Sequence, residues 1–313
     1  MKPSASASAP GKVILLGEHS VVYAEPAISA AIDRRLAVSI RLAAGGSPRA
    51  DAKCHAALVC AAGAFDLEPA TLQIEISSRI PPACGLGSSA ALSLALVRAL
   101  ADLTGAKLSD AEVLRRAGEV ENVFHGTASG VDVAASASGG VVWFERPAPA
   151  NAEPRVEPLA LGRPFDLVIG LSGEVRSTAG PVSRLRLRHD RHPDLYGAFF
   201  RLAGDLVRAG RESLVRGDFD TLGSLMDAAQ GLLNAFGVST PTLERMVSIA
   251  RAAGALGAKL SGAGGGGAMI ALAPERGAAV AGALTAAGFE AFVTTIPAFP
   301  EEAQHARSSR RSA

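Results

Sequence analysis

Pro81-Pro-Ala-Cys-Gly-Leu-Gly-Ser-Ser-Ala-Ala91 is the stretch of this chain that decides the fold. Gly85 and Gly87 allow the backbone to approach a ligand closely, and the apolar periodicity of residues 88–104 predicts a helix. The free N–H groups at the start of such a helix attract an anion, and the helix dipole adds to this attraction. The stretch therefore predicts a phosphate-binding loop, or alternatively a tight turn before a helix capped by Ser88.

The same residues satisfy the dinucleotide-binding pattern GxGxx[GA], so a nicotinamide site has to be weighed against a phosphate site. The dinucleotide pattern requires a strand that runs directly into the turn and a second strand after the helix. Here two prolines follow the strand predicted at 71–80. The first helix is followed by a second one, which the capping-box residues Ser109 and Glu112 open. The context excludes a nicotinamide site, and the absence of a GK[ST] sequence excludes a Walker A loop.

Composition excludes several classes of protein. The 31 basic and 30 acidic residues nearly balance, so the chain lacks the strong positive charge of a nucleic-acid-binding protein. With 48% hydrophobic residues it is not disordered, yet no apolar run reaches the length of a membrane span. Three cysteines without a CxxC pair favour a reducing compartment. We expect a cytoplasmic globular protein with neither nucleic-acid nor membrane partners.

The order of the predicted elements indicates an α+β fold. Strand patterns and helical patterns are grouped rather than alternating, with strands at 4–16, 37–42, 71–80, 165–173 and 289–296, and helices at 88–104, 109–124 and across 181–254. Five prolines between 145 and 165 favour a linker there. We therefore predict two domains, residues 1–160 and 161–313.

A second glycine-rich loop lies at Ser261–Gly267, between two apolar strands in the stretch 258–273. Four consecutive glycines cost more backbone entropy than a simple hairpin requires. A backbone packed tightly against a ligand or another loop explains them better.

Two charged residues lie in apolar surroundings. Lys12 on its strand either extends its ammonium to solvent or acts as a cation beside a phosphate or carboxylate. Asp132 either makes a local turn hydrogen bond or requires a partner, for which Lys12 is the candidate. Glu121 and His125 lie four residues apart on one predicted helix face. The basic run Arg184–His192 is interpreted as a solvated helix end.

In this order, Ser8–Tyr23, Pro81–Ala91 and Lys259–Gly267 resemble the three motifs of the GHMP small-molecule kinases. Within that superfamily, three further segments are similar to the mevalonate kinase family: His125–Asp132, Ser172–Thr178 and Gln230–Thr240. The chain departs from the pattern of that family at Ala128, Val133 and Ala179-Gly180, which bears on substrate choice.

The resemblance implies a two-domain fold with the active site in the cleft between the domains. The N-terminal domain would be like ribosomal protein S5 domain 2 and the C-terminal domain would be ferredoxin-like. It also implies ATP- and Mg²⁺-dependent phosphorylation of the 5-hydroxyl of mevalonate in isoprenoid synthesis, with a homodimer as an open option. The alternatives are another GHMP kinase, acting on phosphomevalonate, homoserine or a sugar, and a catalytically inactive nucleotide-binding regulator on the same fold.

Site roles follow from the resemblance, position by position. Asp132 would orient or deprotonate the attacking hydroxyl, and Lys12 would stabilise charge beside it. Ser89 and Glu121 would bind Mg²⁺. The mevalonate side would contain Glu18, His19, Arg176 and Gly264, and the ATP phosphate loop would contain Pro82, Gly85, Leu86, Gly87, Ser88, Ser89 and Ala90.

Overall fold

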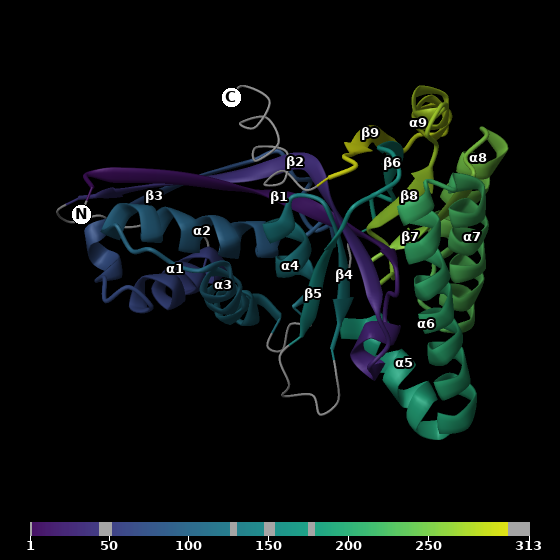
Figure 1. Cartoon of the computed structure of the whole chain (residues 1–313), viewed down its shortest axis with the longest axis horizontal. Coiled ribbons are helices and arrows are strands. Elements are labelled where there is room, and N and C mark those ends of the chain that lie inside the picture. The colour runs from purple at the N-terminus through teal and green to yellow at the C-terminus, as the bar shows by residue number, and fades with distance from the viewer. Residues whose placement is uncertain (1, 44–51, 126–129, 147–153, 175–178, 300–313) are drawn as a thin grey trace.

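The computed structural model describes residues 2–43, 52–125, 130–146, 154–174 and 179–299. Two antiparallel sheets lie next to each other (Figure 1). The first contains β1 (Ser4–Leu16), β2 (Ala27–Leu42), β3 (Leu72–Ser78), β4 (Val141–Glu145) and β5 (Arg155–Leu159). The second contains β6 (Phe165–Leu171), β7 (Gly257–Ser261), β8 (Ala268–Leu272) and β9 (Glu290–Ile296).

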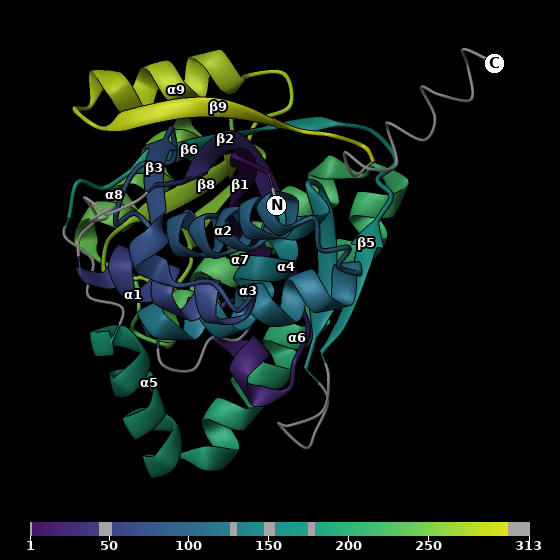
Figure 2. The same ribbon diagram turned by 90° about the vertical axis from the view of Figure 1, so that its left-hand side faces the viewer.

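Helices cover both sheets. The N-terminal set is α1 (Ala52–Gly63), α2 (Ser88–Thr104), α3 (Asp110–His125) and α4 (Val131–Ser138). The C-terminal set is α5 (Ala179–Arg191), α6 (Pro193–Arg216), α7 (Phe219–Ala235), α8 (Pro241–Ala252) and α9 (Gly277–Ala286). Single 3-10 turns lie at Ser20–Tyr23 and Pro69–Thr71. Figure 2 shows α9 lying along β9 at one edge of the molecule. None of these helices is both long and apolar enough to cross a membrane.

The long hairpin of β1 and β2 connects the two halves. β1 pairs with β2 from Ser4 opposite Arg41 to Leu16 opposite Ile28, and the register shifts between Pro10 and Lys12. Proline has no N–H to donate to the ladder, and such irregularities redirect the neighbouring side chains. Both strands of the hairpin also reach the second sheet, where β1 contacts β7 and β2 contacts β9 (Figure 1).

The inner strands β6 and β8 of the second sheet are buried on both faces, which explains why their sequences are almost continuously apolar. On β6, Leu167 and Ile169 share a core with β1, β2 and α2. Val168, on the opposite face, packs in a core with Met246 of α8 and Leu284 of α9. One face of this sheet therefore rests on the N-terminal half, and the other is covered by helices.

Several predicted elements are confirmed. The helix at 88–104 is α2, and it ends at Gly105 in the left-handed conformation. The capping box that opens α3 forms, with the Ser109 N–H and hydroxyl both donating to Glu112 at 2.9 Å. The helical stretch 181–254 contains α5 to α8, and the glycine loop after β7 joins antiparallel strands. The two-domain α+β fold predicted from the sequence is the one observed.

The linker predicted at 145–165 is wrong in part. Arg155–Leu159 forms β5, which pairs with β4 at the edge of the first sheet. An edge strand tolerates Pro158, because only one side of it takes part in the ladder. The first sheet ends at Leu159 and the second begins at Phe165, while the domain limits 1–160 and 161–313 stay a prediction.

Two glycines on α7 differ in the space around them, so substituting each one measures how closely this helix packs on the second sheet. A Cβ at Gly223 would lie 2.4 Å from the Leu256 carbonyl oxygen, whereas a Cβ at Gly231 would meet nothing within 4 Å. Gly223→Ala is expected to lower the free energy of unfolding by about 1–3 kcal/mol. Gly231→Ala is expected to raise it by up to about 1 kcal/mol, because alanine favours helix. Urea unfolding measures both values, and equal effects at the two positions would contradict this packing.

Candidate functional site

Lys12 is buried with only 3% of its surface exposed, although it lies on an apolar strand. Its ammonium lies 2.9 Å from a carboxylate oxygen of Asp132, the partner predicted from the sequence. Because a buried charge without a counterion is strongly unfavourable, this contact explains how β1 tolerates a lysine. Asp132 lies in the first turn of α4, where the helix dipole favours a negative charge, and a third of its side chain remains exposed.

The predicted phosphate loop packs directly on Lys12. The Lys12 N–H donates to the Leu86 carbonyl at 2.9 Å. A Cβ at Gly87 would lie 2.7 Å from Lys12 Cγ, and one at Gly11 would lie 2.7 Å from the Leu86 carbonyl oxygen. These glycines are therefore needed for the close approach of the loop to β1, and Gly85 and Gly87 also have φ of 79° and 74°.

The other predicted loop residues occupy the turn and the start of α2. Pro82 is exposed, Gly85 and Ser88 are half-buried, and Leu86 and Ala90 have buried side chains. Leu86 and Ala90 can therefore offer only main-chain atoms to a ligand. α2 begins at Ser88, so the free amide N–H groups of its first turn lie beside the Lys12–Asp132 pair.

Ser89 and Glu121 are in direct contact. The Ser89 hydroxyl donates to Glu121 Oε1 at 2.7 Å, and Ser93 donates to Oε2 of the same carboxylate at 3.2 Å. His125 Nε2 lies 3.2 Å from Ser89 Oγ and 3.3 Å from Glu121 Oε1. The two predicted magnesium ligands thus place oxygen donors together at the start of α2. No group of three or more His, Cys, Asp or Glu residues elsewhere in the described ranges forms a metal cluster.

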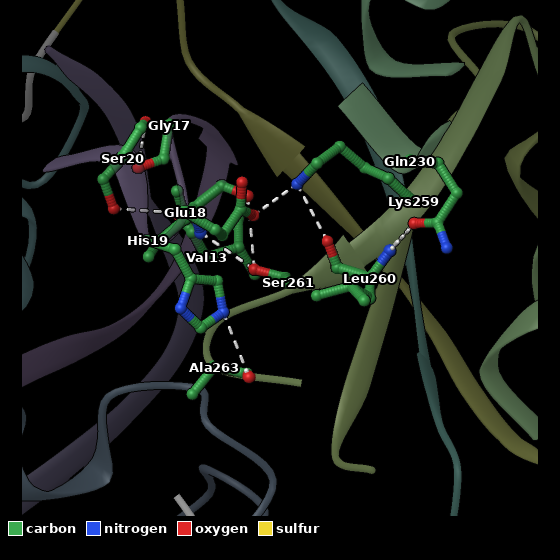
Figure 3. Close-up of polar contacts among 12 residues, drawn as sticks. Val13, Gly17, Glu18, His19, Ser20, Gln230, Lys259, Leu260, Ser261 and Ala263 are labelled. Carbon is green, nitrogen blue, oxygen red and sulfur yellow. Dashed lines mark hydrogen bonds and ion pairs between the residues drawn. The ribbon is translucent and has the colours of Figure 1, made fainter. Parts of the chain in front are cut away.

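Two residues after Lys12, β1 contacts β7. The Ile14 N–H donates to Ser261 Oγ at 2.9 Å, and the Ser261 hydroxyl donates to the Ile14 carbonyl at 3.2 Å. Two residues away on the same face of β7, the Lys259 ammonium donates to Glu18 and to the Leu260 carbonyl (Figure 3). These contacts join the first and third motifs.

Glu18 and Lys259 are both almost completely buried. Burial raises the pKa of the Glu18 carboxyl, and the attraction of Lys259 opposes this rise. Burial likewise lowers the pKa of the Lys259 ammonium, against the attraction of Glu18. Lys259 lies in the third motif, but no role was predicted for it. The available signal was a lysine in a strand whose other residues are small or apolar.

His19 follows Glu18 with φ 63° and ψ −46°, a conformation that costs a non-glycine residue roughly 1–3 kcal/mol. Its ring N–H reaches the Ala263 carbonyl at 3.2 Å (Figure 3). The neighbouring Gly264 has φ 73°, and a Cβ there would lie 2.1 Å from the Val238 carbonyl oxygen. His19 and Gly264, both predicted on the acceptor side, therefore lie near each other at the second glycine loop.

Arg176 lies outside the described residues, as does Ala128. The segment before Arg176 is tied to α8: the hydroxyl groups of Thr240 and Thr242 donate to the Glu174 carboxylate at 2.9 and 2.6 Å. Val133, where the related family has asparagine, is buried in the N-terminal core.

The chain matches two family models, the GHMP kinases N-terminal domain over residues 52–140 and the GHMP kinases C-terminal domain over residues 211–290. It is 37% identical to the mevalonate kinase of Thermococcus sibiricus, over 93% of this chain and 95% of that protein. It is 39% identical to the mevalonate kinase of Methanothermobacter thermautotrophicus, over 86% and 90% of the two chains.

Among solved structures, the fold is similar to that of Leishmania major mevalonate kinase in complex with R-mevalonate. The TM-score is 0.86 and the sequence identity is 29%, with 96% of this chain and 98% of that chain covered. The chain therefore belongs to the GHMP kinase family and, within it, to the mevalonate kinases.

Proposed function

We propose that this chain transfers the γ-phosphoryl group of ATP to the 5-hydroxyl of mevalonate, with Lys12 and Asp132 as its catalytic pair. The observation that carries this proposal is the 2.9 Å contact between the buried Lys12 ammonium and the Asp132 carboxylate, beside the amide groups that open α2. Membership in the mevalonate kinases supports mevalonate as the acceptor.

Lys12 supplies a fixed positive charge. Its side chain is packed against Gly87 and held by Asp132, so little reorganisation is needed when negative charge develops on the transferring group. Charges that are already oriented in this way stabilise a phosphoryl-transfer transition state more than mobile ones. The N–H groups at the start of α2 add donors for the phosphate oxygens of ATP.

Asp132 retains an exposed edge, which can accept a hydrogen bond from the 5-hydroxyl of mevalonate. This contact would direct the hydroxyl oxygen towards the γ-phosphorus, and the same carboxylate would take the proton if transfer requires a base. His19, Gly264 and Arg176 would surround the rest of the acceptor, with the Arg176 guanidinium suited to its carboxylate.

Ser89 and Glu121 fit a magnesium ion, because both offer oxygen atoms at the start of α2, next to the phosphate loop. When bound, Mg²⁺ would neutralise charge on the phosphates of ATP. Two protein ligands are few for a dedicated cage, in keeping with an ion held partly by substrate phosphates.

Acceptor choice is tested by a coupled assay of ADP release with mevalonate, phosphomevalonate, homoserine and galactose. Mevalonate is expected to be the preferred acceptor by kcat/KM. Turnover of homoserine or galactose without turnover of mevalonate would contradict the proposal. ATP binding without turnover of any of the four would instead support the inactive regulator.

Asp132→Asn tests the catalytic pair. The amide is close in shape to the carboxylate but cannot take a proton or carry its charge, so kcat is expected to fall by about 10²–10⁴, roughly 3–5 kcal/mol, with ATP affinity nearly unchanged. Asp102→Asn is the matched control, because Asp102 also pairs with a lysine, Lys2, but on the exposed face of α2. Steady-state kinetics and nucleotide titration give both values. If kcat of the Asp132→Asn enzyme were within a few-fold of kcat of the Asp102→Asn enzyme, this catalytic role of Asp132 would be refuted.

A further inference from the structure

The second buried ion pair, Glu18 with Lys259, is not explained by phosphoryl transfer itself. Glu18 belongs to the turn after β1, and Lys259 to β7 in the C-terminal half. The Lys259 ammonium also donates to its neighbouring carbonyl, that of Leu260, at 2.8 Å, so its donors are directed at protein atoms (Figure 3). Two buried charges at the junction of the halves require a structural or a functional reason.

Only 3% of the Glu18 surface is exposed. The cavity that it lines with Leu16, Gly17 and residues of α6 and α7 measures about 10 Å³. Such a volume holds about one water molecule. The carboxylate is therefore engaged by Lys259 in a packed interior, and any effect on mevalonate has to pass through its neighbours.

The neighbour in question is His19. Its backbone is held in the strained left-handed region, which persists only where the surroundings fix it. On one side, Gly17 has φ 100°, and a Cβ there would lie 2.6 Å from the Pro26 carbonyl oxygen. On the other side, the Ser20 N–H donates to the Glu18 carbonyl at 2.7 Å, and the His19 ring reaches Ala263.

The alternation of β7 shows how one strand holds this whole segment. Lys259 and Ser261 are two residues apart and lie on the same face, towards β1. Ser261 bonds both main-chain polar groups of Ile14, and Lys259 bonds the side chain of Glu18. Two residues further, Ala263 accepts from His19. Lys259, Ser261 and Ala263 of the third motif thus each contact the end of the first.

We propose that the Glu18–Lys259 ion pair is a positioning device that fixes His19 on the mevalonate side, and that Glu18 acts through His19 without touching the substrate. This inference rests on the proposed function, because it assumes that the His19 side of the site receives mevalonate. It predicts an effect on the acceptor and not on ATP, since the phosphate loop contacts Lys12 within β1, whereas Glu18 and His19 lie beyond the last residue of this strand.

The test compares Glu18→Gln with the double variant Glu18→Gln/Lys259→Met. The single variant leaves an ammonium buried without its counterion, while the double variant leaves a neutral pair. In both, KM for mevalonate is expected to rise about 10- to 100-fold, the size of effect expected from a small misplacement of a substrate-positioning group. KM for ATP is expected to stay within about twofold. The thermal stability that the single variant loses is expected to be restored in the double variant, although the KM of the double variant for mevalonate stays high.

Glu25→Gln is the matched control, because Glu25 also pairs across the two halves, with Arg208 of α6 at 3.0 Å, but at the surface. Its two KM values are expected to match those of the wild type. An unchanged KM for mevalonate in the double variant, or an equal rise of both KM values, would overturn the positioning role alone. Wild-type enzyme that fails to turn over mevalonate would overturn the proposed function, and this inference with it.

Discussion

The burial of the Lys12 ammonium against Asp132 is the contact on which the rest of the site depends. An apolar strand accepts a lysine only where a counterion meets it, and α4 supplies that counterion in its first turn. The same requirement explains the glycines on either side, since Gly11 and Gly87 allow the phosphate loop to close over the lysine. The start of α2, the loop and the catalytic pair are thereby assembled around one side chain of β1.

β1 also links the two halves, and neighbouring residues in its C-terminal part have different partners. Lys12 meets the phosphate loop and α4 of the N-terminal half, while Ile14 and Glu18 meet Ser261 and Lys259 of β7. The two glycine-rich loops accordingly differ in what they pack against. The first approaches β1 and presents helix amides, whereas the second turns next to Val238 and His19. A single strand thus sets the distance between the phosphate side and the acceptor side of the proposed site.

Local patterns were sufficient to predict the parts of the fold that local interactions determine. α2 has its own apolar face and a glycine stop, and the capping box of α3 lies within four residues. The Lys12–Asp132 contact was predicted because each charge required a partner and few were available. α4 and β5 were not predicted: α4 has only eight residues, and β5, which pairs with β4, lies in a proline-rich stretch that favours a linker. The Glu18–Lys259 pair spans 241 positions, so no spacing rule could connect its members.

The catalytic pair is tested most directly by a crystal structure of the chain with a non-hydrolysable ATP analogue, Mg²⁺ and mevalonate. The 5-hydroxyl of mevalonate is expected to donate a hydrogen bond to the Asp132 carboxylate, and the Lys12 ammonium is expected to contact both Asp132 and an oxygen of the γ-phosphate. The Glu18 carboxylate is expected to stay bound to Lys259 and out of contact with the acceptor. A structure in which the 5-hydroxyl lies out of reach of Asp132, or in which Lys12 has no contact with the γ-phosphate, would contradict the proposed catalytic pair.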